Sequence, residues 1–317
     1  MASPSVNQPN GSSAVHPRPA APIRSAMIFA NPRAGRGNAW RAARAIIRGL
    51  RGAGIGVKTI SDLPADATAE QLGAAEAAII IGGDGTVRAV ARAFLDKLGR
   101  APPLLPVPVG TANLMGRHLG IDWHSSDLAQ RVAASLGRGQ LRHLDAASAN
   151  GQLLLLMAGI GIDGHIVHQL NRLRKGSINY ASYLLPAART FASYQYPSLQ
   201  VHIDGQEVFP SAPAVAFVGN VSEYGTGFSL VPGARSDDGL LDVCVIPVRS
   251  RGDAIQQFLR AVVGEHVLAE GVVYARGKHI QIQSPQAVPV QVDGDPAGYT
   301  PLSIDLLPQR VPFIVPA

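Results

Sequence analysis

The sequence predicts a two-domain protein in which a parallel sheet between layers of helices is followed by a mostly antiparallel β domain. From residue 25 to about residue 147, strand-like apolar runs alternate with helical patterns. This alternation is typical of a three-layer, Rossmann-like α/β domain. From residue 148 to 317, short apolar runs are separated by Gly, Pro, Asn and Asp, as in a β-sandwich or barrel. The composition, 46% hydrophobic and 16% charged, is sufficient for both cores.

The first domain follows a polar, Pro-rich segment, residues 1–24, which we expect to be a disordered tail. A helix is predicted over residues 38–54 because Trp40, Ile46, Ile47 and Leu50 share one helical face. The other elements follow from the same periodicities: strands at 25–30, 55–60, 77–83 and 103–110, and helices at 65–76, through Val87 to Leu98, and at 111–120.

The second domain is predicted from short strands bounded by turn residues. An Asp-Gly pair at 204–205 indicates a hairpin, and a return of the extreme C-terminus to the first domain stays open. The expected strands lie near 141–150, 151–162, 198–205, 206–210, 212–220, 239–248, 279–285 and 288–295, with helices near 168–193 and 251–265.

Composition also limits the classes of function. The single cysteine, Cys244, lies in an apolar run, which indicates a core residue in a protein of the reducing cytoplasm. The longest apolar run, residues 153–162, is far shorter than the ~18 residues of a membrane span, so any membrane contact is expected to be peripheral. The net charge of +6 favours anionic partners, although a charge that only confers solubility is the alternative.

The stretch IIIGGDGT, residues 79–86, ends a buried strand with glycines. Such glycines let backbone N–H groups approach a ligand, and the following helix presents its positive end there, which predicts a phosphate site. No Gly-Lys-Ser/Thr follows, so this is not a Walker A loop. Asp84 would repel phosphate unless Mg²⁺ or a substrate hydroxyl lay between them; the alternative is that Asp84 caps the helix.

Five segments in order resemble the lipid-kinase branch of the family that includes diacylglycerol kinases, sphingosine kinases and NAD kinases. They are NPRAGRG (31–37), GGDGT (82–86), PVGTANLMGRHLGI (108–121), SEYGTGFSLVPGARSDDGLLDVCVI (222–246) and VQVDGDPAG (290–298). The resemblance covers nearly everything after residue 24. It implies a cleft between two domains and ATP as the phosphate donor.

By position, the resemblance implies two sets of ligands. The nucleotide would contact Asn31, Pro32, Arg33, Ala34, Gly35, Ser61, Gly82, Gly83, Asp84, Gly85, Thr86, Val87, Arg88 and Thr111. A structural Mg²⁺ would be bound by the carbonyls of Arg235 and Leu240 and the carboxylate of Asp238, an oxygen set that suits this ion. The alternative for Asp-Asp-Gly-Leu at 237–240 is an ordinary turn before a strand.

The family places its catalytic base in a late Asp-Gly-Glu motif, which here reads Asp293-Gly294-Asp295. Asp295, one methylene shorter than the family's glutamate, is the expected base; Asp293 is the second candidate, and Asp84 stays open as a third. A hairpin turn is compatible with either role. Two further departures are Arg88, where the family often has Asn and which could pair with phosphate, and Leu114, where it often has Asp.

We therefore expect an ATP- and Mg²⁺-dependent lipid kinase that phosphorylates the hydroxyl of a diacylglycerol or a sphingoid-type lipid at a membrane surface. The basic segment 168–191 could rest on anionic lipid, or could be an ordinary solvated helix. The alternatives are an NAD kinase-like enzyme and a nucleotide-binding regulatory protein without turnover. No aromatic–basic signature supports nucleic-acid binding. The oligomeric state stays open, with a homodimer as one option.

Overall fold

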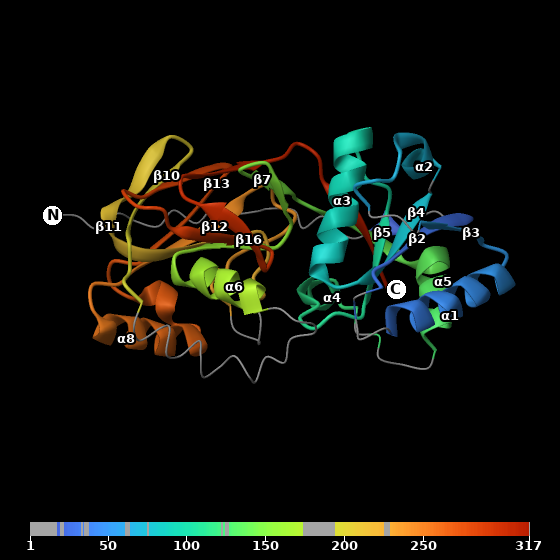
Figure 1. The fold of residues 1–317 in the computed structure, drawn as a ribbon, viewed down its shortest axis with the longest axis horizontal. Helices are drawn as coiled ribbons and strands as arrows, with labels where there is room; N and C mark the ends of the chain where they lie inside the picture. The colour runs from blue at the N-terminus through green and yellow to red at the C-terminus, as the bar shows by residue number, and fades with distance from the viewer. Residues whose placement is uncertain are drawn as a thin grey trace.

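A computed structural model shows two domains side by side (Figure 1). It describes residues 18–19, 22–32, 34, 38–60, 64–74, 76–121, 123, 127–173, 194–224 and 229–316. The fold class predicted from the sequence, a parallel α/β domain followed by an antiparallel β domain, is confirmed.

The N-terminal domain is built on a seven-stranded sheet with the order β1-β6-β18-β5-β4-β2-β3. Its strands are β1 (Arg18–Pro19), β2 (Ser25–Ala30), β3 (Gly56–Ile60), β4 (Ala77–Gly82), β5 (Leu104–Pro108), β6 (Gln140–Leu144) and β18 (Val311–Val315). Strands β2 to β5 are parallel, so their carboxyl ends meet at one edge. Every residue of β4 is buried, because helices cover both faces of the sheet there.

The helices of this domain are α1 (Asn38–Gly52), α2 (Ala69–Gly73), α3 (Asp84–Leu98), α4 (Leu114–His118) and α5 (Leu128–Arg138). Helix α1 packs on α5 so closely that a Cβ on Gly49 would lie 2.7 Å from the Cβ of Ala129. The buried stripe of α1 is Ala39, Ala43, Ile46 and Leu50. Trp40 lies beside this stripe and is 42% exposed, so its expected place on the inward face was wrong.

The C-terminal domain is a curved antiparallel sheet that nearly closes into a barrel. Its strands are β7 (Ala147–Ala149), β8 (Gln152–Leu154), β9 (Met157–Ile160), β10 (Ser198–Ile203), β11 (Gln206–Gly219), β12 (Leu241–Pro247), β13 (Val273–Gly277), β14 (His279–Gln283), β15 (Pro289–Val292), β16 (Asp295–Tyr299) and β17 (Leu302–Leu306). Helices α6 (Ile162–Leu173) and α8 (Arg251–Val262) and the 3₁₀ turn η3 (His266–Leu268) lie on its outside. The sheet encloses its own apolar core of mostly Val, Ile, Leu and Ala.

The C-terminal end of the chain follows the possibility that the sequence analysis left open, whereas the N-terminal end differs from the expectation. Strand β18 leaves the C-terminal domain and inserts between β5 and β6 of the first sheet. Arg18 and Pro19 of the expected disordered tail pair with Leu141 and Gln140 of β6. This pairing is made by the backbone, which composition does not reveal.

Other differences concern helices. The helix expected at 168–193 begins at Ile162, and most of that range, including Arg174, Lys175 and Arg189, lies outside the described residues. Helix α5 was not predicted. Among the helices of the described ranges, none combines the length and hydropathy of a bilayer-spanning segment.

The insertion of β18 predicts that the last residues of the chain stabilise the first domain. Ile314 is fully buried and pairs with Leu141. We expect Ile314→Ala to lower the free energy of unfolding by about 2–5 kcal/mol, since a buried methyl-rich side chain leaves a cavity. The matched change Ile255→Ala, at a position 54% exposed, should stay within about 0.5 kcal/mol. Equal effects of the two substitutions in denaturant titrations would contradict this account.

Candidate functional site

The carboxyl ends of β2, β4 and β5 form one continuous backbone surface. Asn31, just after β2, donates through its Nδ2 to Thr86 Oγ1 at 3.0 Å, and its own N–H donates to the carbonyl of Ile81. The first predicted nucleotide loop is thereby joined to the glycine turn.

Glycines are required where these strand ends meet. A Cβ on Gly82 would lie 2.5 Å from Thr86 Oγ1, and a Cβ on Gly110 would lie 2.7 Å from the Cα of Gly83. The turn after β4 and the turn after β5, which also carries Thr111, therefore touch through bare backbone. A side chain at Gly110 would separate the two loops, and a side chain at Gly82 would clash with Thr86 in the first turn of α3.

Asp84 caps a neighbouring helix instead of its own. Its two carboxylate oxygens accept hydrogen bonds from the N–H groups of Leu114 and Met115, at 3.0 and 2.9 Å, at the start of α4. Burial raises the pKa of Asp84, and these two backbone hydrogen bonds oppose the rise. The carboxylate thus holds the amino end of α3 against α4.

Arg88 extends from α3 to the late acidic hairpin of the other domain. Its guanidinium donates to Asp295 Oδ2 at 2.6 Å and to the carbonyl of Val292. The side chains of Arg88 and Asp295 are 16% and 35% exposed. A Cβ on Gly85 would lie 3.3 Å from Asp295 Oδ2, so this carboxylate lies directly against the glycine turn.

Asp293 has a different environment from Asp295. Its carboxylate accepts hydrogen bonds from the N–H groups of Leu155, Leu156 and Met157, between 2.9 and 3.0 Å. Its φ of 49° and that of Gly294, 82°, form the tight turn between β15 and β16. Burial raises the pKa of Asp293 to about 6, against the opposing charge of Arg88. Asp293 therefore fixes the hairpin to the segment between β8 and β9.

A second set of hydrogen bonds supports the hairpin from behind. Gln291 accepts from the Gly294 N–H at 2.8 Å and donates to Asp163 Oδ2 at 2.8 Å. Tyr224 donates to the other oxygen of Asp163. Gly159 leaves room for this carboxylate, because a Cβ there would lie 1.7 Å from Asp163 Oδ2.

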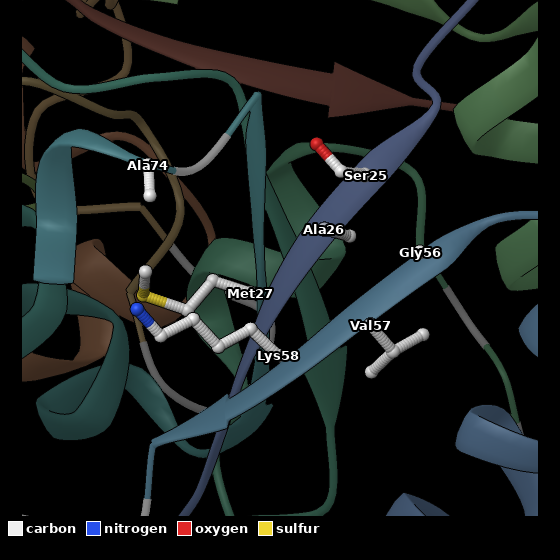
Figure 2. A pocket seen from close by; sticks show the side chains of 7 residues that line it. All are labelled: Ser25, Ala26, Met27, Gly56, Val57, Lys58 and Ala74. Carbon is white, nitrogen blue, oxygen red and sulfur yellow. The ribbon is translucent and has the colours of Figure 1, made fainter.

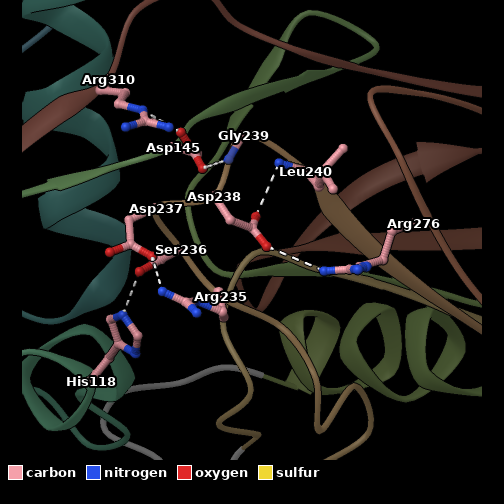
Figure 3. A network of polar contacts seen from close by, with 10 residues as sticks. All are labelled: His118, Asp145, Arg235, Ser236, Asp237, Asp238, Gly239, Leu240, Arg276 and Arg310. Carbon is pink, nitrogen blue, oxygen red and sulfur yellow. Dashed lines mark hydrogen bonds and ion pairs between the residues drawn. The ribbon is translucent and has the colours of Figure 1, made fainter. Parts of the chain in front are cut away.

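The Asp-Gly-Leu turn lies at the junction of the domains (Figure 3). Asp145 accepts from the Gly239 N–H and from Arg310 Nε, each at 2.7 Å. Asp238 accepts from the Leu240 N–H at 3.1 Å and lies 3.5 Å from Arg276 Nη1. These contacts connect the turn to β13 and to the chain that leads into β18.

The residues at this turn only partly fit the predicted structural Mg²⁺. Hard carboxylate oxygens are present. Burial raises the pKa of Asp145 and of Asp242, and the charge of Asp238 adds a smaller rise to each. However, Asp238 faces a backbone N–H and Arg276, and the described residues contain no group of three metal-ligating side chains. The ligand set of Arg235, Asp238 and Leu240 therefore stays a prediction that depends on backbone carbonyls.

His118, at the end of α4, makes a further contact between the domains. Its Nδ1 lies 2.9 Å from Glu223 Oε2, and its Nε2 lies 2.8 Å from Ser236 Oγ. The hydrogen bond from His118 is the main cause of the lowered pKa of Glu223. From the sequence we predicted no role in the site for His118, Asp145, Asp163 or Gln291.

A hollow of about 270 Å³ lies away from this region, at the other end of the first sheet (Figure 2). It is lined by the first residues of β2 and β3 and by Ala74. Because ligands of open α/β sheets bind at the carboxyl ends of strands, this hollow is not the candidate site.

Most of the predicted site residues gather in two places. Asn31, Gly82 to Arg88 and Thr111 lie at the carboxyl ends of the strands, with Asp295 against them. Pro32 and Ala34 follow Asn31 in a turn closed by the Ala34 N–H and the Asn31 carbonyl. Arg235, Asp238 and Leu240 lie at the domain junction. Arg33, Gly35 and Ser61 fall outside the described residues.

Comparisons with known proteins match both domains. Residues 25–149 match the family model described as diacylglycerol kinase catalytic domain, and residues 157–315 match the YegS C-terminal NAD kinase beta sandwich-like domain. The chain is 24% identical to a protein named diacylglycerol kinase from Bacillus subtilis, over 93% of this chain and 97% of that protein. It is 30% identical to a protein from Pseudomonas fluorescens named "Probable lipid kinase YegS-like", over 68% and 69% of the two chains.

A solved structure also resembles this fold. A crystal structure of a diacylglycerol kinase from Bacillus anthracis superposes with a TM-score of 0.72 at 24% sequence identity, and the match covers 92% of this chain and 97% of that chain.

The buried Asp293 predicts a specific dependence of stability on pH. The pKa of Asp293 is about 6 in the folded chain, whereas in the unfolded chain it has the ordinary aspartate value of 3.8. Between these values the unfolded state binds fewer protons, so stability should fall as pH rises, by on the order of 2–3 kcal/mol. Asp293→Asn should remove this slope in urea titrations at stepped pH. The control Asp96→Asn, at an exposed ion pair, should retain it.

Proposed function

This chain belongs to the family of diacylglycerol kinases and YegS-like lipid kinases, and on that premise we propose that it transfers the γ-phosphate of ATP to the hydroxyl group of a lipid. The observation that carries the proposal is the position of Asp295, a partly exposed carboxylate from one domain that lies against the glycine turn of the other. A phosphate acceptor and a phosphate donor have to meet at such a junction.

The glycine turn supports the role of triphosphate binding. The bare backbones of Gly83 and Gly110 touch, and the amino end of α3 begins at Asp84. N–H groups at a helix start stabilise anions. Because the carboxylate of Asp84 is engaged by α4, we propose that Asp84 shapes this turn, and that the phosphates are bound by backbone and by Arg88.

The contacts favour Asp295 over Asp293 as the base. All three described hydrogen bonds to the Asp293 carboxylate come from backbone N–H groups, and Asp293 is 9% exposed. Asp295 is on the open side of the same turn. We propose that Asp295 accepts the proton of the lipid hydroxyl while that oxygen attacks the γ-phosphorus, the phosphorus–oxygen bond to ADP breaks, and a phosphomonoester forms.

Arg88 occupies the position where the family often has Asn, and its guanidinium can pair either with Asp295 or with a bound phosphate. In the described contacts its guanidinium pairs with Asp295. A bound triphosphate offers the same guanidinium a more highly charged partner. We propose that phosphate draws Arg88 away from Asp295 in part, so that the carboxylate becomes available to the hydroxyl when the donor is present.

Magnesium has a supporting place in this proposal. When bound with the nucleotide, Mg²⁺ would neutralise charge on the phosphates. No step is assigned to a metal at the Asp-Gly-Leu turn, because Asp238 there faces Arg276 and a backbone N–H.

The acceptor class is tested with labelled ATP and a panel of lipids. We expect the labelled product to be a phosphorylated diacylglycerol, sphingoid base, ceramide or glycerophospholipid, and NAD is included because the second family model is NAD kinase-like. Labelled NADP with no lipid product would replace the proposal with an NAD kinase. Nucleotide binding with no product from any acceptor would indicate a regulatory protein.

Asp295→Asn removes the proposed base with little change in volume. We expect kcat for the lipid to fall by about 10²–10⁴-fold, with a dissociation constant for ATP within about threefold of the wild type. Asp295→Glu restores the family's acid and should retain most of the activity. Wild-type turnover in Asp295→Asn would reassign the base.

Arg88→Met removes the guanidinium but keeps an unbranched side chain. We expect affinity for ATP to fall by about tenfold or more, since one charge-assisted contact to phosphate is lost. Arg92→Met is the matched control, because Arg92 lies one turn along α3 and also reaches the second domain, at the carbonyl of Gly151. Equal losses of ATP affinity in the two variants would show that Arg88 acts only as a tie between the domains.

A further inference from the structure

Helix α8 faces the protein with small side chains and solvent with large apolar ones. Its buried residues are Ala254 and Ala261. The side chains exposed on α8 and the following turn are Ile255 (54%), Phe258 (47%), Leu259 (59%), Val262 (52%), Val263 (67%) and Leu268 (81%). An ordinary surface helix has the opposite arrangement. Contiguous exposed apolar residues of this kind mark an interaction surface; we call this set the α8 ridge.

The ridge is built on well-defined local structure. Ser250 caps α8 by accepting from the Asp253 N–H at 3.1 Å, and Asp253 in turn accepts from the Arg249 N–H. After the turn at Gly264, the fully buried His266 hydrogen-bonds through Nε2 to the carbonyl of Leu230 at 3.0 Å. Since these contacts fix both ends, the exposed apolar side chains are presented on a folded surface.

Positive charge lies at the amino-terminal end of the ridge, and one further arginine lies in the last turn of α8. Arg249 and Arg251 are exposed, and Arg260 is partly exposed beside Val263. None of the three makes an ion pair with another residue in the described part of the chain, and Asp253 is engaged in the cap. Glu265 and Glu270 lie at the other end, near η3. The chain as a whole carries a net charge of +6.

The ridge and the candidate site lie toward the same side of the molecule. In Figure 1, α8 lies at the lower edge of the C-terminal domain, and α6 and α4 lie in the lower half of the view, near the junction of the domains. The amino end of α3, which carries the glycine turn, lies beside α4 through the contacts of Asp84.

We propose that the α8 ridge docks the protein on an anionic lipid bilayer. The inference rests on the proposed function, because a long-chain lipid acceptor would be presented to the enzyme by a membrane. The apolar side chains would enter the boundary between headgroups and acyl chains, while the arginines at the start of α8 contact anionic headgroups, as in interfacial amphipathic helices. A bilayer at this position would meet the side of the protein toward which the candidate site lies.

The test uses the full chain and measures sedimentation with vesicles in the absence of ATP. The vesicles contain either phosphatidylglycerol mixed with phosphatidylcholine or phosphatidylcholine alone. We expect Ile255→Gln/Leu259→Gln to bind the anionic vesicles roughly tenfold more weakly than the wild type, because two apolar anchors are lost. The matched variant Ile255→Met/Leu259→Met, which keeps apolar side chains, should bind like the wild type. Binding of the wild type should be weaker to phosphatidylcholine alone.

A second measurement separates this inference from the proposed function. The glutamine variant should phosphorylate a short-chain, monomeric diacylglycerol as fast as the wild type, but a vesicle-embedded lipid more slowly. If the protein bound vesicles through α8 but transferred phosphate to no lipid, the docking surface would be supported and the kinase proposal would be wrong.

Wild-type vesicle binding by the glutamine variant would overturn the inference. So would a change of oligomeric state in the glutamine variant with unchanged vesicle binding, since a second copy of the chain would then cover the ridge.

Discussion

One guanidinium joins the two halves of the candidate site. Arg88 lies on the helix that follows the glycine turn. It binds the carbonyl of Val292 and the carboxylate of Asp295, which is 207 positions further along the chain. This contact brings the carboxylate of Asp295 to the glycine turn of the other domain. With side chains 16% and 35% exposed, the pair is less screened than a fully solvated one. The other polar contacts position the backbone around it.

The three aspartates near the turn show how environment divides one side-chain type among several roles. Asp84 and Asp293 each face backbone N–H groups, which makes them structural anchors for α4 and for the β8–β9 segment. Asp295 instead pairs with the long side chain of an arginine, and its own side chain is 35% exposed. Only a carboxylate of the last kind can exchange a proton with a ligand without breaking a buried network.

The sequence predicted what depends on short-range pattern. The fully buried β4, the glycines after it and the helical spacing in α3 are all readable within about 20 residues. Contacts between segments far apart in the sequence were harder to predict. The return of the C-terminus to the first domain could only be left open, because Val311–Val315 carry no local sign of the strands with which they pair. Nothing in the sequence around Asp145 distinguishes it from other aspartates that follow a strand. Trp40 was placed wrongly because the small residue next to it, Ala39, has the helical spacing to Ala43, Ile46 and Leu50 that defines the buried face of α1. The nucleotide and metal ligands implied by family resemblance remain predictions.

The return of β18 has a mechanical consequence. Within the described residues the chain passes between the domains twice, once through Asp145 and Ala146 and once through residues 307–310. These two linkers are themselves joined, by the ion pair of Arg310 with Asp145 and by the hydrogen bond from the Leu307 N–H to the Ala146 carbonyl. Two adjacent covalent connections act as a hinge: they permit one domain to rotate relative to the other about the line through both linkers, and they resist twisting or sliding of the domains. The edge of the domain junction beside the linkers therefore keeps its spacing, while the spacing elsewhere along the junction depends on side-chain contacts such as that of Arg88 with Asp295.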